Sequence, residues 1–201
     1  MGRVLPRFLF CLLAAGFWGR LPAAAQAASQ SEEVDPKTTT RVTLGSTSGT
    51  PGTSVVVPIY FTPAEGSEVG RLQLQINFVS ANLKFDKLET GIAAELGNVD
   101  LDSEIQEEKN DQDVPVSTLT VNASFLTPEP PAKGIPQGLL GYITFRISET
   151  GRPATISLRT QAEANELKTN QPVAELRSFD ATVEVLAPGT QPAVACFLFS
   201  H

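Results

Sequence analysis

A stretch of eight residues, 71–78, alternates polar and apolar side chains without a break: Arg-Leu-Gln-Leu-Gln-Ile-Asn-Phe. Successive side chains of a β-strand point to opposite faces, so the apolar half of this stretch can enter one core. The polar half then forms a flat row on the other face. This pattern is typical of an antiparallel sheet with one solvated face, and it does not fit the period of a helix.

Seven further segments are apolar or alternating and are separated by turn residues rich in Gly and Pro. They predict strands at 41–44, 54–61, 82–88, 117–125, 139–147, 154–158 and 181–185. Pro58 cannot donate a ladder hydrogen bond, so its strand is expected at a sheet edge or with a break there. A short helical turn is expected at 91–96, and either a short helix or a loop at 163–169. Together these segments predict an all-β sandwich of about nine strands.

Seven carboxylates crowd residues 100–113, which we interpret as a solvated acidic loop. Its start, Asp100-Leu-Asp102-Ser-Glu104, alternates oxygen ligands. An EF-hand calcium loop needs Gly at position six and Glu at position twelve, and these positions are Ile105 and Asp111 here. We therefore predict no metal site of that type, and an irregular calcium site stays open as an alternative.

The first 27 residues have the features of a secretory signal peptide. Arg3 and Arg7 form a basic start, residues 8–18 are apolar, and Ala25-Gln26-Ala27 fits a cleavage site. The apolar run is shorter than the roughly 20 residues of a spanning helix, although an uncleaved anchor is the alternative. We expect export to the extracellular space or periplasm, with no membrane span after cleavage. The predicted domains are a signal peptide at 1–27, a flexible leader at 28–40, a sandwich at 41–186, and a linker with a short apolar C-terminal tail at 187–201.

Charge and reactive side chains restrict the function classes. The net charge is −7, and removing residues 1–27 leaves 12 basic against 22 acidic residues and a charge of −10. Such a surface repels nucleic acid and anionic lipid, so we expect no nucleic-acid partner. After cleavage Cys196 is the only cysteine, which rules out an intramolecular disulfide. His201 is the only histidine, so we predict no catalytic triad, no cofactor and no enzyme activity.

Four stretches, taken in order, resemble the cohesin domain, the receptor module of bacterial cellulosomes. They are Gly49–Ile59, which is similar to an opening G-x-P-G-x-x-V-x-V-P-V segment; Gly70–Phe85, similar to the central strand and the turn after it; Gly138–Ile147, similar to G-x-L-A-x-I-T-F-x-V; and Phe179–Val185, similar to a closing D-G-x-V-x-V. The match covers roughly residues 41–186. It implies a jelly-roll sandwich without enzyme activity, in which one sheet face docks a calcium-loaded dockerin module.

The resemblance also implies where a partner would bind. In the family, an Asn and an Asp of the central strand hydrogen-bond dockerin hydroxyls, and the matching positions here are Arg71 and Gln73. Three strands placed together by the resemblance give a predicted partner-binding face of Arg71, Gln73, Gln75, Asn77, Thr118, Thr120, Asn122, Leu140, Tyr142 and Arg146. Interfaces favour Tyr and Arg, but outward strand positions are polar in any soluble sandwich. The residues alone leave both a docking face and a plain solvated face open.

We therefore predict a secreted, non-catalytic, cohesin-like module that docks a dockerin-like module or another secreted protein, in extracellular polysaccharide breakdown. One alternative is a carbohydrate-binding module on the same scaffold, with polysaccharide as the partner. Another is a structural protein of the envelope or of a secretion system. Trp18 lies in the predicted signal peptide, and only Tyr60 and Tyr142 remain as Tyr or Trp. This disfavours a row of aromatic platforms for a flat crystalline sugar.

Overall fold

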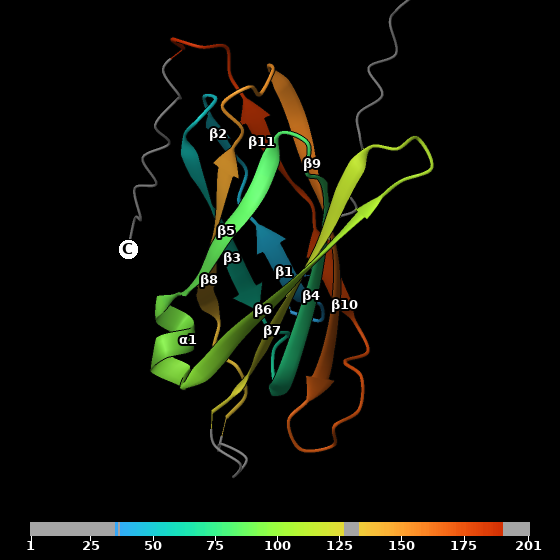
Figure 1. Ribbon diagram of the computed structural model, residues 1–201. Coiled ribbons are helices and arrows are strands. Elements are labelled where there is room, and N and C mark those ends of the chain that lie inside the picture. Colours follow the sequence, from blue (N-terminus) through green and yellow to red (C-terminus); the bar gives the residue numbers. More distant parts are fainter. Residues whose placement is uncertain (1–34, 36, 127–132, 191–201) are drawn as a thin grey trace, which may run out of the picture. The chain divides into compact units, whose positions relative to one another are not determined.

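Eleven strands and one short helix make up the part of the chain described by the computed structural model, residues 35, 37–126 and 133–190 (Figure 1). They are β1 (Thr40–Leu44), β2 (Thr47–Gly49), β3 (Ser54–Thr62), β4 (Val69–Val79), β5 (Leu83–Thr90), α1 (Ile92–Gly97), β6 (Val99–Lys109), β7 (Pro115–Phe125), β8 (Gly138–Ile147), β9 (Ala154–Glu166), β10 (Leu176–Phe179) and β11 (Ala181–Val185). The all-β prediction is confirmed, with eleven strands instead of about nine. No described helix is long and apolar enough to cross a membrane.

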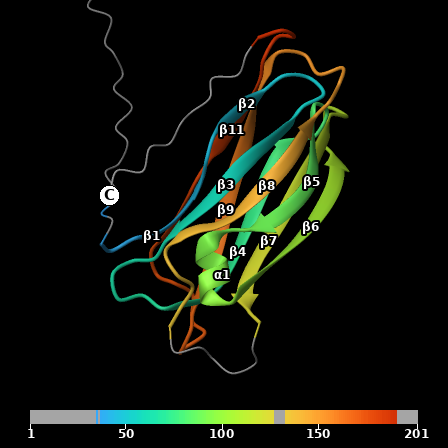
Figure 2. The same ribbon diagram turned by 90° about the vertical axis from the view of Figure 1, so that its left-hand side faces the viewer.

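The strands form two mixed sheets, which Figures 1 and 2 show from two sides. Their orders are β10-β1-β3-β8-β5 and β2-β11-β9-β4-β7-β6. Most neighbours are antiparallel, but β1 runs parallel to β10 and β2 runs parallel to β11. Two of the changes between the sheets are short corners, from β1 to β2 and from β10 to β11. The prediction missed β2 and β10 because each has at most four residues.

The core lies between the two sheets and contains the apolar half of the alternating stretch. Leu72, Leu74, Ile76 and Phe78 are all at most 4 % exposed, as the period of two predicts. Phe145 of the facing sheet lies edge-on to Phe78, with 5.2 Å between ring centroids. Aromatic pairs favour this geometry, so the two rings join the sheets by more than the area they bury.

An extra residue in β8 changes which of its side chains face inward. Ile59 pairs with Gly141, but the next residue of β3, Tyr60, pairs with Leu139. Leu140 therefore has no partner on β3. Strict alternation predicted Leu139 inward and Leu140 outward, and this was wrong: Leu140 is 1 % exposed, whereas Leu139 is half-buried.

Pro58 lies next to this bulge, where a break was expected. The alternative of an edge strand is wrong, because β3 lies between β1 and β8. The missing N–H is tolerated because β1 ends at Leu44, opposite Ile59. Beyond that point, Gly45 donates its N–H to the carbonyl oxygen of Pro58 at 2.9 Å.

Residues 99–109 form the edge strand β6, where a solvated loop was expected. β6 pairs with β7 along its whole length, so its backbone hydrogen bonds come from the ladder despite the acidic sequence. Val99, Leu101 and Ile105 alternate with acidic residues, but Ser103 interrupts this series and every side chain from Glu104 to Lys109 is exposed. Charged side chains on an edge strand oppose pairing with another sheet. Sequence patterning fails here because only one end of the strand covers the core.

Strand β9 also extends beyond its predicted end. It continues to Glu166, so most of the segment expected as a short helix or loop is strand, followed by a turn at 167–169. The predicted leader runs into β1, where Thr39 and Thr40 are buried. The predicted signal peptide and residues 191–201 of the predicted tail lie outside the described residues.

Asp180 holds the corner between β10 and β11 against β9. Its Oδ1 accepts hydrogen bonds from the N–H of Thr160 at 2.7 Å and from Thr160 Oγ1 at 3.0 Å. We expect Asp180→Ala to lower the free energy of unfolding by about 1.5–3 kcal/mol, because it leaves the N–H and the hydroxyl group of the nearly buried Thr160 without their acceptor. Urea denaturation measures this loss. The exposed Asp111→Ala should change stability by less than about 0.5 kcal/mol, and equal effects of the two variants would contradict the assignment.

Candidate functional site

The outward side chains of four neighbouring strands form one surface, which we call the polar face. Its centre is β4 and β7, with β9 on one side and β6 on the other. The residues are Arg159, Gln161, Glu163 and Asn165 of β9; Arg71, Gln73, Gln75 and Asn77 of β4; Thr118, Thr120, Asn122 and Ser124 of β7; and Asp100, Asp102, Glu104 and Gln106 of β6. Their neighbours in sequence point into the core, so the polar face follows from the period of two.

Strand register arranges the polar face in rungs. Gln75 lies between Gln161 and Thr120, and Thr120 lies next to Glu104. The centre consists of short or uncharged polar side chains, most of them half-buried. In the central strand β7, Asn122 Oδ1 is buried and accepts no hydrogen bond from any described residue. A buried acceptor without a donor costs free energy, so the Asn122 side chain gains if it turns its oxygen toward a donor of a partner.

Charge is divided across the polar face. The carboxylates of Asp100, Asp102 and Glu104 point outward from β6, the edge strand. The two cations, Arg71 and Arg159, lie on β4 and β9, and β9 also carries the carboxylate of Glu163. No group of three or more His, Cys, Asp or Glu in the described residues could hold a metal ion.

Seven of the ten predicted site residues lie together on the polar face: Arg71, Gln73, Gln75, Asn77, Thr118, Thr120 and Asn122. The prediction that β8 shares this surface is wrong. β8 belongs to the other sheet, between β3 and β5, so Leu140, Tyr142 and Arg146 lie away from the polar face. Leu140 is buried, Tyr142 is half-buried opposite Pro58, and Arg146 is exposed. The resemblance had placed the three strands together. Alternation alone shows that a strand has two faces, but it does not show to which sheet the strand belongs.

Sequence reasoning also missed the contributions of β9 and β6. A weak signal for β9 was present, since Leu158, Ala162 and Ala164 alternate with charged or amide side chains. Thr160 interrupts this series, and the small alanines weaken it. For β6 the signal was confined to the first half, where Val99, Leu101 and Ile105 alternate with acids, because every position after Ile105 is polar.

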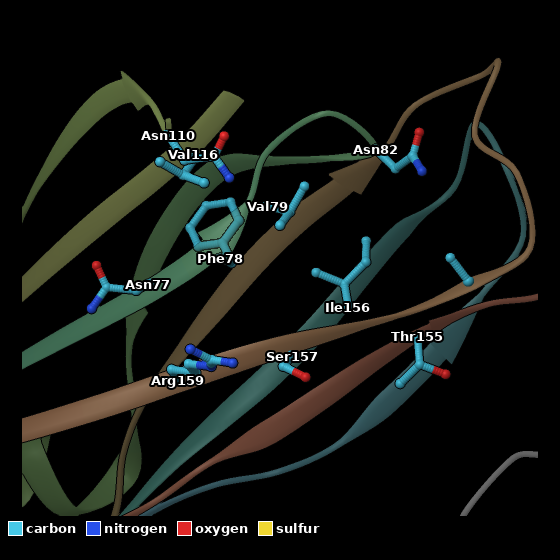
Figure 3. Close-up of a pocket in the computed structure, with 11 residues that line it drawn as sticks. Asn77, Phe78, Val79, Asn82, Asn110, Val116, Thr155, Ile156, Ser157 and Arg159 are labelled. Carbon is cyan, nitrogen blue, oxygen red and sulfur yellow. The ribbon is translucent and has the colours of Figure 1, made fainter. Parts of the chain in front are cut away.

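One end of the polar face is hollowed by a cavity of about 590 Å³ (Figure 3). Its lining is Asn77, Phe78, Val79, Asn82, Asn110, Val116, Ala154, Thr155, Ile156, Ser157 and Arg159. These residues come from β4 and the turn after it, from β7 and the turn before it, and from β9. Figure 3 shows Thr155, Ile156, Ser157 and Arg159 spaced along one strand, with Phe78 and Val79 across from them. The lining mixes amides, hydroxyls and one guanidinium with apolar side chains, a composition common in binding sites.

A second, smaller hollow of about 170 Å³ lies at the other end of the polar face. It is lined by Arg71, Gln73, Glu163 and Asn165. Arg71 and Gln73, for which the resemblance predicts contact with a partner, therefore line a concave part of the surface.

The outer side of the other sheet carries a different surface, which we call the tyrosine groove. It has a volume of about 740 Å³ and is lined by Val56, Pro58, Tyr60, Ile92, Gly138, Leu139 and Tyr142. Tyr60 and Tyr142 are the only tyrosines of the chain, and both lie here. Leu139 reaches this groove because of the β8 bulge. The groove is apolar where the polar face is hydrophilic, so the two surfaces would suit different ligands.

Comparisons with known proteins identify the fold. No protein-family model and no curated protein matches the sequence. Among solved structures, the third cohesin of ScaC from Acetivibrio cellulolyticus, in complex with the ScaB dockerin, has a TM-score of 0.55, 22% identity, and covers 74% of this chain and 99% of its own. The sixth cohesin of that organism's scaffoldin B, in complex with a Cel5 dockerin mutant, has a TM-score of 0.55, 14% identity, and covers 74% and 100%.

A non-cellulosomal cohesin from the hyperthermophilic archaeon Archaeoglobus fulgidus is also similar, with a TM-score of 0.50 and 17% identity, covering 74% of this chain and 91% of its own. These identities are low, and the shared property is the fold. The described chain therefore has a cohesin-like jelly-roll fold, as the four sequence stretches implied.

Proposed function

We propose that the chain is a non-catalytic docking module that binds a partner protein through the polar face. The observation that carries this proposal is the centre of the face, where half-buried uncharged side chains of the paired strands β4 and β7 surround Asn122, whose Oδ1 has no donor among the described residues. Paired strands keep the surface flat, so binding orders little of the backbone. Charged residues stand at the sides of the face, as in interfaces whose centre is depleted of charge.

The solved cohesins with similar folds support a partner of the dockerin type, because two of them are seen in complex with dockerins. The partner that fits this chain should differ from a familiar type I dockerin. Arg71 presents only donors, whereas the Asn and Asp implied by the family at the corresponding places offer acceptors. We further propose that the protein is exported through the predicted signal peptide and acts in extracellular polysaccharide breakdown.

A substitution at the centre of the face tests this proposal. Thr120→Arg places a long cation among half-buried side chains, and we expect it to weaken partner binding at least tenfold, as loss of a central contact does. The immobilised chain is used to capture proteins from the secreted fraction of the source, with and without calcium, and the captured protein is identified by mass spectrometry. Calorimetric titration with the purified partner then measures the affinity of each variant.

The matched control is Val56→Arg, the same cation at an exposed position of the tyrosine groove. It should bind the partner as the unmodified chain does. If Val56→Arg loses binding and Thr120→Arg keeps it, the tyrosine groove is the docking surface and our proposal is wrong. If glycans are bound and no protein partner is, the chain is a carbohydrate-binding module.

A further inference from the structure

We propose that the cavity beside Arg159 receives a carboxylate side chain, Asp or Glu, of the partner protein docked on the polar face. This inference rests on the proposed function, since it assigns the chemistry of one contact of that interface. Asn77 and Arg159 form one rung between β4 and β9, so the cavity is continuous with the face. A partner lying over Gln75 would reach this rung two residues further along the strand, about 7 Å away.

The amide side chain of Asn110 presents donors to the cavity. Its Oδ1 accepts hydrogen bonds from the backbone N–H groups of Gln112 at 3.0 Å and Val114 at 2.9 Å. Backbone N–H groups can only donate, so they fix which end of the amide faces them. The two lone pairs of the oxygen are therefore used within the turn, and what Asn110 can still offer a ligand is its NH₂ group.

Asn77 is arranged in the same way. Its Oδ1 accepts a hydrogen bond from Thr118 Oγ1 at 2.7 Å, which directs the oxygen toward β7. Its NH₂ group is then the part of the amide that can serve a ligand. With the guanidinium of Arg159, which has only donors, three side chains of the cavity favour an acceptor.

The charge balance of the cavity selects an anionic acceptor over a neutral one. Arg159 takes part in none of the ion pairs found among the described residues. No carboxylate lines the cavity. Of the two acids in the nearby β6–β7 turn, Asp113 is paired with Lys109 at 2.7 Å, and Asp111 is exposed and lies outside the lining. A carboxylate that enters therefore meets a guanidinium without a competing acid, and charge-assisted hydrogen bonds are the stronger ones.

The apolar part of the lining favours a protein side chain as the source of the carboxylate. Val79 is 43% exposed, and Val116 is half-buried beside it. These side chains can cover the methylene groups of a Glu or an apolar neighbour in the partner. Covering them also removes water from around Arg159, which strengthens its attraction to the anion.

Nuclear magnetic resonance of the ¹⁵N-labelled chain tests the inference without a known partner. The probes are two peptides, acetyl-Leu-Glu-Leu-amide and the same peptide with Gln in place of Glu. We expect the Glu peptide to shift the backbone signals of Asn77, Asn110 and Arg159, and the Gln peptide to bind at least tenfold more weakly. Arg159→Gln should abolish this difference, and Arg152→Gln, at an exposed position outside the cavity lining, should preserve it.

Equal binding of both peptides, shifts at other residues, or no shift would each overturn the inference. The proposed function is judged separately, by partner binding of Thr120→Arg. If Thr120→Arg abolishes partner binding while Arg159→Gln leaves it unchanged, the docking face stands and the carboxylate contact is wrong. If the inference is correct, Arg159→Gln weakens partner binding about tenfold. Mutation of the contacting acid in the partner then causes no further loss when it is combined with Arg159→Gln.

Discussion

Replacing Phe145 with Ala is expected to lower the free energy of unfolding by about 3–5 kcal/mol, the range for a large aromatic residue removed from a core. Phe145 is fully buried and lies edge-on to Phe78 at 5.2 Å and to Phe85 at 6.4 Å between ring centroids. Phe78 belongs to the facing sheet, so the substitution removes contacts within one sheet and between the two. The space left behind cannot close easily, because paired strands on both sides hold the backbone in place.

Urea denaturation followed by circular dichroism measures this loss. Phe179→Ala is the matched control, since Phe179 lies on the short strand β10 and is 38% exposed. It should cost less than half as much as Phe145→Ala, because less apolar area is removed from contact. A similar cost for the two variants would show that Phe145 does not join the sheets as the structure indicates.

Replacing Gly91 with Ala is expected to cost about 2–3 kcal/mol, in the upper part of the range for overpacking. A Cβ at this position would lie 2.5 Å from the carbonyl oxygen of Leu139 and 2.8 Å from the carbonyl carbon of Leu140. These are backbone atoms and cannot turn aside as a flexible side chain can. The backbone angles of Gly91, φ −97° and ψ 167°, are ordinary for any residue, so the cost is steric.

Gly66→Ala is the control variant, because it changes stability through the backbone angle alone and not through a steric clash. Gly66 has φ +79°, and a Cβ there would meet no atom within 4 Å, so only the backbone angle opposes the change. We expect a loss of about 1 kcal/mol there. In the Gly91 variant, amide hydrogen exchange should also quicken in α1 and at the start of β6, because α1 connects β5 to β6. Unchanged exchange in these segments would contradict the close packing of Gly91 on β8.

The sequence predicts most strands because burial on one side imposes a period of two. Leu72, Leu74 and Ile76 show this period and are buried as expected. The period fails where its cause is absent. In β6 the ladder with β7 forms the strand while most of its side chains meet water on both faces. In β8 one extra residue reverses the direction of Leu139 and Leu140. The alternation of polar and apolar residues does not reveal where such a bulge occurs.

The candidate site is predictable to the extent that it depends on single strands. Gln75 and Thr120 point outward from strands that the sequence identifies, and they are adjacent in the structure. The sheet to which Tyr142 belongs depends on connections between strands far apart in the chain. The cavity beside Arg159 depends on two turns and on β9, whose register with β4 is fixed only when the sandwich closes. Its chemistry therefore could not be predicted before the fold was known.

The parallel pairing of the first strands with the last ones sets how the domain would carry a mechanical load. The chain enters the domain at Thr40, opposite Leu176, and leaves it after Val185, opposite Gly49. A pull on these two ends acts along the paired strands and in opposite directions on each pair. The hydrogen bonds of each parallel pair are then loaded in shear and must break together. In a hairpin that is pulled open at its end, the hydrogen bonds break one after another.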